Sequence, residues 1–543
     1  MTHTSAVSSP RKDGNAGRSG AVAAYQLLGY FPAVWPAIRS FMVGIMPLAG
    51  IETPSDTVPM LSCPRGVMSE PNHKTASNQA GAYSPEGVSD ASQVPSADMA
   101  TIEAWLKEHK ISEVECLVPD MTGNARGKFI PAHQFIANRE IKLPESIMVQ
   151  TVTGEYTDDH WDFVEPTDTD MLLRPDASTL RLVPWGREPT GQIIADCYRA
   201  DGEPHPLSTR NVLRYVLGLY EEAGLKPVVA PEVEFYLVNK NTDPDYELMP
   251  PKGRSGRREV ARLSYSIDAV AEFEDFVEDM YDFADKQQLD VDTLIHENGA
   301  AQLEINFNHG DPLAMADQVF VFKRTVRETA QRYNMYATFM AKPMQREPGS
   351  AMHIHQSVID LETGKNIFAT DDGQPSQAMM EFMGGLQRYT PELISFYAPN
   401  VNSYRRLAPD ISAPINLSWG FDNRTTAFRV PNSDPANLRI ENRFPGVDAN
   451  PYLAITATLA SGLLGMRQHL QPTEPHQGTA NEDSVGVART LEEGVRKLNN
   501  TPELQAMIGE LFMRAYAAVK LDEFEEFNRV ISSWEREHLL LQV

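Results

Sequence analysis

The sequence predicts an α+β protein in which a small β-rich domain precedes a larger domain of alternating strands and helices. Residues 145–200 contain short strand-like runs separated by many Asp, Pro and Gly residues. Beyond residue 206, apolar strand patterns alternate with segments whose apolar residues recur at helical spacing. We therefore place the small domain at residues 99–206 and the larger domain at residues 207–543.

The small domain is expected to begin with a helix. Apolar residues recur at helical spacing over residues 100–111, and residues 114–120 have the pattern of a strand. Residues 121–128, MTGNARGK, contain two glycines and predict a turn. The short strands of residues 145–200 complete this domain.

The larger domain is expected to open with an amphipathic helix. Ser208 or Thr209 can cap its N-terminus, and Gly224 can end it, because glycine readily adopts the left-handed conformation found after a helix. An apolar helix at residues 451–466, capped by Asn450, is expected to lie in the core. Between these helices the sequence predicts strands at 228–238 and 352–358 and helices at 271–289 and 316–334.

The overall composition excludes several classes of protein. The formal net charge of −26 argues against non-specific binding to nucleic acid. The three cysteines stand at no metal-ligand spacing, and so small a number suits a reducing cytoplasm better than a disulfide framework. We therefore expect a cytoplasmic protein.

Residues 1–98 differ from the rest of the chain. The apolar run at residues 21–50 is broken by two prolines and an arginine, so it lacks the ~20 consecutive apolar residues of a membrane span. Residues 52–98 are rich in Ser, Pro, Gly and Ala and have no sustained periodicity. We interpret residues 1–98 as a disordered tail, or as an over-extended start ahead of a natural start at Met99, rather than as a membrane anchor.

Acidic and histidine residues recur in apolar, strand-like sequence of the larger domain. Carboxylates are rarely buried without a partner, and hard divalent cations prefer oxygen ligands. Side chains two residues apart on a strand lie on the same face of the sheet. Glu232 and Glu234 in PEVEFYLV (231–238) therefore share a face, and so do His353 and His355 in MHIHQSV (352–358). Each residue alone could be an exposed strand residue. Together they predict a site for two or more divalent cations, built from Glu232, Glu234, Glu297, Glu304, His353, His355 and Glu441.

Arginines form a second group in the same domain. Guanidinium groups suit bidentate binding of carboxylate and phosphate, although one or two of these arginines are expected to form only surface ion pairs. The sequence has no GxxxxGKS or GxxxxGKT loop and no GxGxxG motif, so a nucleotide would be held through metals and arginines. The arginines concerned are Arg405, Arg406, Arg424, Arg429, Arg439 and Arg443.

From about residue 100 to residue 470 the chain resembles the bacterial-type glutamine synthetase superfamily, and within it the γ-glutamylpolyamine and γ-glutamylputrescine synthetases. The resemblance is carried by PEVEFYLV, HENGAAQLEIN, AMHIHQS, NSYRRL, NRTTAFRVP and RIENRFPGVDANPYL, in the family's order. It implies a β-grasp fold for the small domain and a glutamine synthetase-type catalytic α+β domain after it. It also implies a homo-oligomer, commonly a dodecamer, with active sites between neighbouring subunits of a ring.

The resemblance implies a role for each candidate residue, with ATP and two to three Mg²⁺ or Mn²⁺ ions as cofactors. Ligands of the first metal would be Glu234, Glu297 and Glu304. Ligands of the second, which bridges the nucleotide phosphates, would be Glu232, His353 and Glu441. Glutamate would be bound by Gly349, Arg406 and Arg443. The nucleotide would be contacted by His355, Ser357, Arg424, Arg429 and Arg439. Catalytic roles would fall to Arg424, Arg406 and Glu304.

The implied reaction is ligation of glutamate to an amine. Transfer of the ATP γ-phosphoryl group to the glutamate side chain gives an acyl phosphate, from which an amine displaces phosphate. Family members that use ammonia carry DGSS in the small domain and a Glu in a PGYEAPV-like flap. Here residues 147–159 contain no DGSS, and the flap PDISAPI (409–415) has Ser412 in place of that Glu. These losses remove negative charge and make room.

We therefore expect a larger amine than ammonia, such as putrescine, spermidine, another diamine, ethanolamine or an aromatic monoamine. Glu155, Asp158 and Asp159 could hold the distal ammonium of a polyamine, or could be only solvated. Two alternatives remain: glutamine synthetase proper, and a catalytically silent member with a structural or regulatory role. The residues also leave open which amine is used and which group takes its proton.

Overall fold

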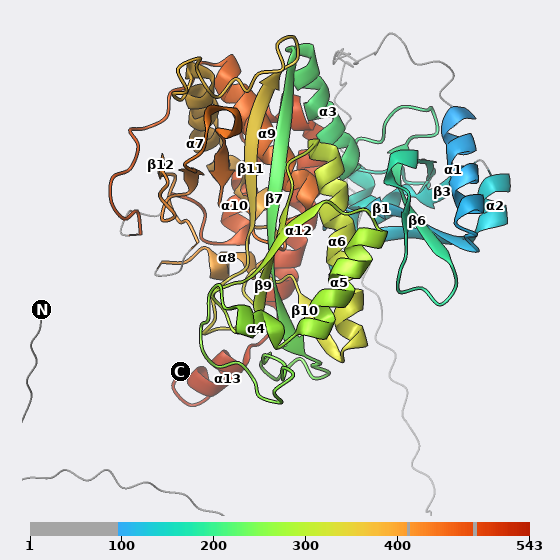
Figure 1. The fold of residues 1–543 in the computed structure, drawn as a ribbon, viewed down its shortest axis with the longest axis horizontal. Helices are drawn as coiled ribbons and strands as arrows, with labels where there is room; N and C mark the ends of the chain where they lie inside the picture. The colour runs from blue at the N-terminus through green and yellow to red at the C-terminus, as the bar shows by residue number, and fades with distance from the viewer. Residues whose placement is uncertain (1–95, 139, 410–412, 482–485) are drawn as a thin grey trace, which may run out of the picture. The chain divides into compact units, whose positions relative to one another are not determined.

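The computed structural model describes residues 96–138, 140–409, 413–481 and 486–543 (Figure 1). The interpretation of residues 1–98 falls almost wholly outside this part of the chain, and so does Ser412 of the flap. Among the helices of the described residues, none has the length and apolar character needed to cross a membrane.

The N-terminal part of the described chain contains a six-stranded sheet in the order β2-β1-β6-β4-β3, with β5 pairing β6. The central pair β1 and β6 is parallel, and both strands are almost entirely buried. The elements, coloured blue to teal in Figure 1, are α1 Ser96–Glu108, β1 Glu113–Pro119, β2 Ala125–Pro131, α2 Ala132–Ala137, β3 Ile141–Pro144, η1 Glu145–Val149, η2 His160–Asp162, β4 Asp170–Pro175, η3 Ala177–Thr179, β5 Arg181–Leu182 and β6 Thr190–Tyr198.

The prediction of a turn over residues 121–128 is wrong in its second half. The turn is confined to the residues before Ala125, where β2 begins and pairs with β1 in antiparallel register. Asp120 stabilises the tight turn, because its Oδ1 accepts from the backbone N–H groups of Thr122 and Asn124 at 2.9 Å each. The β2 side chains are mostly exposed, so the segment lacks the apolar alternation that marks a strand in sequence.

The larger domain is built on an eight-stranded sheet in the order β12-β13-β14-β11-β7-β9-β8, with β10 pairing β7. The long strands β7 and β11 are antiparallel neighbours at its centre (Figure 1). The strands are β7 Leu225–Asn239, β8 Val291–His296, β9 Gln302–Phe307, β10 Met335–Thr338, β11 Met352–Asp360, β12 Trp419–Phe421, β13 Phe428–Val430 and β14 Ile440–Asn442.

Helices of the larger domain begin at residues that cap them. The Ser208 side chain accepts from Asn211 N at the start of α3, and Asn450 accepts from two backbone N–H groups at the start of α9. The α9 helix is buried on every face and packs against α7, as its uniform apolar sequence predicts. The helices are α3 Thr209–Glu222, α4 Ile267–Ala271, α5 Glu274–Lys286, α6 Pro312–Arg332, α7 Gln377–Tyr397, α8 Ser403–Arg406, η4 Pro435–Asn437, α9 Pro451–Arg467, α10 Leu491–Leu498, α11 Pro502–Ile508, α12 Glu510–Asn528 and α13 Ser533–Leu539.

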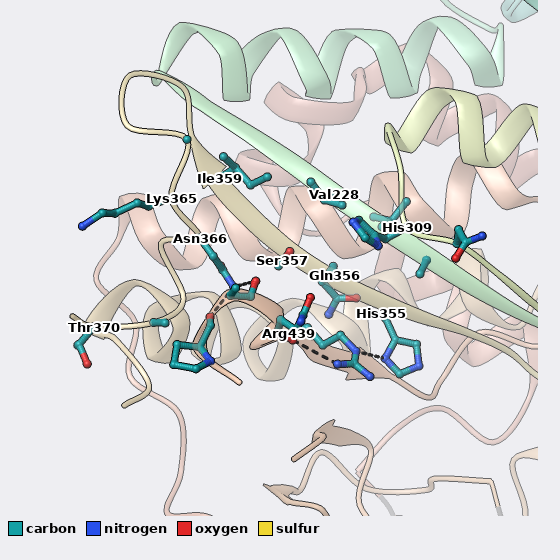
Figure 2. A pocket seen from close by; sticks show the side chains of 18 of the residues that line it. Val228, His309, His355, Gln356, Ser357, Ile359, Lys365, Asn366, Thr370 and Arg439 are labelled. Carbon is teal, nitrogen blue, oxygen red and sulfur yellow. Dashed lines mark hydrogen bonds between the residues drawn. The ribbon is translucent and has the colours of Figure 1, made fainter. Parts of the chain in front are cut away.

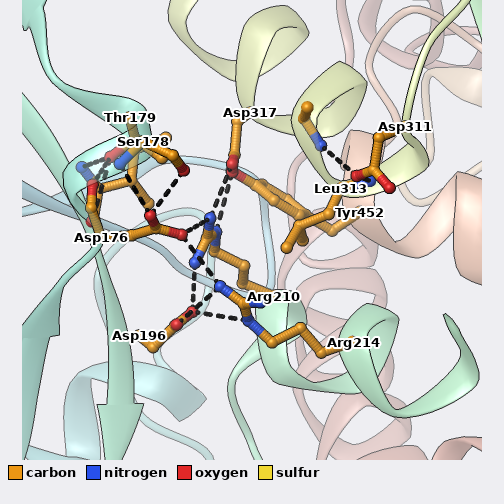
Figure 3. A network of polar contacts seen from close by, with 12 residues as sticks. Asp176, Ser178, Thr179, Asp196, Arg210, Arg214, Asp311, Leu313, Asp317 and Tyr452 are labelled. Carbon is orange, nitrogen blue, oxygen red and sulfur yellow. Dashed lines mark hydrogen bonds and ion pairs between the residues drawn. The ribbon is translucent and has the colours of Figure 1, made fainter. Parts of the chain in front are cut away.

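A buried ion-pair network connects the two sheets at Arg210 of α3 (Figure 3). Its guanidinium contacts Asp176 and Asp196 beside β4 and β6, and Asp317 on α6. Tyr452 of α9 donates to Asp317 Oδ1 at 2.6 Å. Arg210 therefore ties the six-stranded sheet to α6, which packs against β7 and β10 of the eight-stranded sheet.

Candidate active site

Two glutamates and a histidine from three adjacent strands meet at the centre of the catalytic sheet. The ligand atoms of Glu232 on β7, His353 on β11 and Glu441 on β14 all lie within 4.8 Å of one another. Strand register brings them together, because His353 pairs with Glu232 and the neighbouring His355 pairs with Glu441. His353 Nδ1 lies 3.0 Å from Glu232 Oε2 and 3.7 Å from Glu441 Oε1. Imidazole and carboxylate at this spacing suit a divalent metal ion.

A second group of carboxylates lies beside the first. Glu234 on β7 and Glu304 on β9 are directly opposed in the sheet, and Glu297 follows the end of β8. All three line a cavity of about 310 Å³, together with Glu232 and His353. The first predicted triad and two members of the second, Glu232 and His353, therefore open into one cavity, and Glu441 lies behind them within 4.8 Å.

Mutual repulsion among these carboxylates is visible in their pKa values. Burial, and then the neighbouring Glu297, raise the pKa of Glu234 to about 8. Burial, followed by Glu232, Glu234 and Glu297, raises the pKa of Glu304 to about 9. Such groups release their protons readily only when a cation offsets the negative charge. The donor set therefore fits hard divalent cations.

Glu441 has the opposite electrostatic environment. Burial would raise its pKa, but Arg443, with His355 and His353, lowers it to about 2. Arg443 Nη1 donates to its Oε1 at 2.5 Å, and Arg429 Nη1 donates to its Oε2 at 2.8 Å. Glu441 is therefore held ionised and fixed in orientation.

The arginines predicted to bind substrate line the same cavity. Arg406 is buried, and its Nη1 and Nη2 donate to the backbone carbonyls of Phe444 and Arg443 at 2.8 and 2.9 Å. Arg424 is exposed to solvent and lines the cavity beside Gly349. Gly349 is a glycine for steric reasons, because an added Cβ would lie 2.7 Å from Arg406 Cγ and from the Ala341 carbonyl oxygen. The cavity thus combines carboxylate ligands on one wall with guanidinium groups on another.

A larger cavity of about 620 Å³ is lined by His355, Ser357 and Arg439 (Figure 2). Arg439 Nε donates to His355 Nδ1 at 3.1 Å. His355 therefore carries its proton on Nε2, which lies 2.8 Å from Glu232 Oε1. This chain of contacts joins the larger cavity to the metal-ligand cluster. Arg429, to which the family resemblance gives a nucleotide contact, donates to Glu441 and Asp422 in this structure.

The sequence analysis missed several residues of the site. Tyr265, Ile295, Asn298 and Ala413 line the smaller cavity, and although Asn298 lies in the HENGAAQLEIN motif and Ala413 in the flap, their side chains gave no chemical reason to single them out. Gln302 is fully buried and hydrogen-bonded to Glu234. Its position two residues before Glu304 on β9 placed it on the ligand-bearing face, so strand alternation could have identified it.

Comparisons with known proteins agree with this geometry. The protein-family model described as the glutamine synthetase catalytic domain matches residues 206–539 of this chain. A glutamate–isopropylamine ligase from a Pseudomonas species is 33% identical over 454 residues, covering 80% of this chain and 96% of its own. The γ-glutamylputrescine synthetase PuuA of Escherichia coli is 32% identical over 451 residues, covering 82% and 95%.

A solved structure has the same fold. The complex of GmaS with ADP superposes with a TM-score of 0.69 at 26% identity and covers 81% of this chain and 99% of its own. The family match spans most of the chain and includes every strand that supplies a ligand residue. The chain therefore belongs to the glutamine synthetase family.

Proposed function

We propose that this chain joins the γ-carboxylate of glutamate to an organic amine, using ATP and passing through γ-glutamyl phosphate. Membership of the family makes it an ATP-dependent carboxylate–amine ligase. Its amine substrate would be an alkyl amine or a polyamine, such as putrescine or spermidine, rather than ammonia.

One observation carries the proposal: a cluster of buried metal-ligand residues lies between two cavities of suitable size and lining. The larger cavity, with Arg439, His355 and Ser357, would hold the nucleotide, and the ADP complex of GmaS supports that use. The smaller cavity, with Arg406, Arg443 and Gly349, would hold glutamate. Phosphoryl transfer from ATP to glutamate would then occur beside the metal-ligand carboxylates.

The two ligand triads would hold divalent ions, Mg²⁺ or Mn²⁺, two to three in number. Glu234, Glu297 and Glu304 would bind one ion, and Glu232, His353 and Glu441 another. Bound there, the ions would offset charge on the nucleotide phosphates and on the phosphoryl group in transfer.

The remaining chemistry would depend on the arginines. Arg406 and Arg443 would orient the glutamate so that a γ-carboxylate oxygen attacks the γ-phosphorus of ATP, and ADP leaves. Arg424 would neutralise charge on the transferred group, because its guanidinium is an exposed positive charge in the lining of the cavity. The amine nitrogen then attacks the acyl carbon, phosphate leaves with the electrons of the broken C–O bond, and the nitrogen loses a proton.

Two features favour an organic amine over ammonium. The loop at residues 147–159 has no DGSS, and the lining of the smaller cavity includes the aromatic Tyr265 and the apolar Ile295 and Ala413. Such side chains favour contact with an alkyl chain and do nothing for ammonium. Relatives named for isopropylamine and putrescine support the same choice.

The wider architecture is part of this proposal. The small domain, at residues 99–206, would have a β-grasp fold, and the catalytic domain would cover residues 207–543. The protein would be a cytoplasmic homo-oligomer, with a dodecamer as the family's common form.

The test is an amine panel with ATP, glutamate and Mg²⁺, in which γ-glutamyl products are measured by mass spectrometry. We expect product with putrescine, spermidine or a monoamine, and none from the Glu304→Ala variant. Faster product formation with ammonium than with any organic amine would make the protein a glutamine synthetase. A wild-type chain that is inactive with every amine of the panel would favour a catalytically silent family member with a structural or regulatory role.

A further inference from the structure

The side chain of Gln302 connects three parts of the site. Gln302 is the first residue of β9 and has no exposed surface. Its Oε1 accepts from Gly299 N at 2.9 Å. Its Nε2 lies 3.1 Å from Glu234 Oε2, 3.0 Å from the Gly349 carbonyl oxygen and 3.1 Å from Ser350 Oγ. One amide therefore touches a proposed metal ligand, the proposed glutamate loop and the turn after Glu297.

The contact with Glu234 determines which of its oxygens faces the cavity. Both donors to this carboxylate, Gln302 Nε2 and Ala351 N at 2.8 Å, bind Oε2. Oε1 is left for a cation in the cavity that Glu234 lines. A carboxylate held in this way does not have to be reoriented when an ion binds.

The turn that carries Glu297 is fixed by the same residue. Gln302 closes it with its backbone, since Glu297 N donates to Gln302 O at 2.8 Å and Gln302 N donates to Gly299 O at 3.0 Å. The hydrogen bond from Gly299 N to the side-chain oxygen of Gln302 is a third contact that closes this turn. Ala301 within the turn has a left-handed backbone, φ +59°, which costs energy for a residue with a Cβ. Such a conformation persists only where surrounding contacts hold it.

We infer that Gln302 is a positioning residue that holds Glu234 and the Glu297 turn in a geometry ready for metal, and that couples both to the Gly349 loop. Gln302 lines neither of the two cavities, so it would act through Glu234 and the Glu297 turn. The inference rests on the proposed metal site, but it does not depend on which amine is used. Loss of the Gln302 side chain should weaken metal binding even when neither glutamate nor nucleotide is present.

Gln287 provides a matched control. It is also fully buried, and its amide makes two hydrogen bonds, donating to Leu182 O at 3.1 Å and accepting from Thr325 Oγ1 at 2.5 Å. It touches none of the cavity residues named above. Gln287→Met and Gln302→Met therefore remove the same chemical group at the same burial, and only the second removes it beside the site.

The experiment is titration of the purified full-length chain with Mn²⁺ alone, followed by the electron paramagnetic resonance signal of free Mn²⁺. We expect Gln302→Met to raise the Mn²⁺ dissociation constant by roughly 10- to 100-fold, as for other residues that orient metal ligands. Gln287→Met should bind Mn²⁺ as the wild type does, with a similar loss of thermal stability. If Gln302→Met does not fold, Gln302→Asn should show the same weakening, because its shorter amide cannot reach both Gly299 and Gly349.

Mn²⁺ binding by Gln302→Met equal to that of the wild type would overturn the inference, and so would a wild type that does not bind Mn²⁺. Because no amine or glutamate is present, a chain that fails the amine panel but binds Mn²⁺ still tests the role of Gln302. The two failures are therefore distinguishable.

Discussion

Arg210 donates to both carboxylate oxygens of Asp317, from Nε to Oδ1 at 3.0 Å and from Nη2 to Oδ2 at 2.8 Å. The pair is buried, and Arg210 also contacts Asp176 and Asp196. Burial would lower the pKa of Arg210, but Asp317 and Asp196 raise it above its usual value. Removing Arg210 takes away the ion-pair partner of buried Asp317 and leaves Asp176 and Asp196 with Arg214 alone.

Replacing Arg210 should therefore be far more costly than replacing its neighbour. We expect Arg210→Met to destabilise the protein by about 3–5 kcal/mol, the usual cost of breaking a buried charge pair. Arg214 contacts Asp176 and Asp196 from a position that is 44% exposed, so Arg214→Met should cost no more than about 1 kcal/mol. Urea unfolding followed by circular dichroism measures both. Equal losses would show that Arg210 has no special role in joining the domains.

Adding a methyl group at Gly349 should disturb glutamate binding. The new Cβ would lie 2.7 Å from Arg406 Cγ, so Gly349→Ala must displace that side chain. We expect kcat/KM for glutamate to fall by roughly 100-fold, because small misplacements of binding groups are costly in catalysis. Gly218→Ala is the control, since nothing lies within 4 Å of the added atom on α3. Steady-state kinetics with a saturating amine measure the effect, and an unchanged value for Gly349→Ala would contradict it.

Neutralising Glu441 should reduce stabilisation by metal. Each bound Mn²⁺ stabilises the fold by about 2.7 kcal/mol at 100 times its dissociation constant. Glu441→Gln retains the shape but loses the charge, and we expect a smaller Mn²⁺-induced rise in its thermal midpoint than in the wild type, because Glu234, Glu297 and Glu304 are unchanged. The exposed Glu272 serves as control, since Glu272→Gln should keep the full wild-type shift. A normal Mn²⁺-induced shift in Glu441→Gln would exclude Glu441 as a ligand.

Stability should fall in mild acid because of His205. Burial, and then Arg199, lower the pKa of this histidine from 6.5 to about 4. Its Nδ1 accepts from Leu207 N at 3.3 Å, which favours the neutral ring. The unfolded chain takes up the proton near pH 6.5, whereas the folded chain takes it up only near pH 4. The contribution of His205 to stability is therefore complete above pH 6.5 and lost as pH falls towards 4.

His205→Asn keeps a neutral acceptor for Leu207 and removes the titration. Between pH 7.5 and pH 5 the wild type should lose about 2 kcal/mol more unfolding free energy than this variant. Glu145, whose Oε1 lies 3.7 Å from His205 Nε2, is present in both proteins, so the comparison isolates the histidine. Parallel pH profiles in urea unfolding would rule out this account.

Much of the site could be predicted because most of its candidate metal-ligand residues lie on strands. Alternation on a strand needs only local sequence, and it placed Glu232 with Glu234 and His353 with His355 correctly. The fold class followed from similarly local patterns. The exposed strand β2 was missed because its pairing with β1 leaves no apolar alternation in the sequence.

Contacts between distant segments could not be predicted in this way. Gln302 reaches Gly349 and Ser350 only because β9 and the loop before β11 both lie against β7. The pairing of Arg429 with Glu441 across β13 and β14 likewise depends on strand order. Sheet topology, rather than spacing along the chain, decides such contacts.

The ligand-bearing strands are also widely separated in the order of synthesis. Glu232 leaves the ribosome more than two hundred residues before Glu441, which occupies the last strand added to the sheet. A nascent or truncated polypeptide lacking β14 has only part of its coordination set, and its unpaired acidic groups repel one another. Metal binding would then occur late in folding, and tight binding of the ions would indicate that the catalytic sheet is complete.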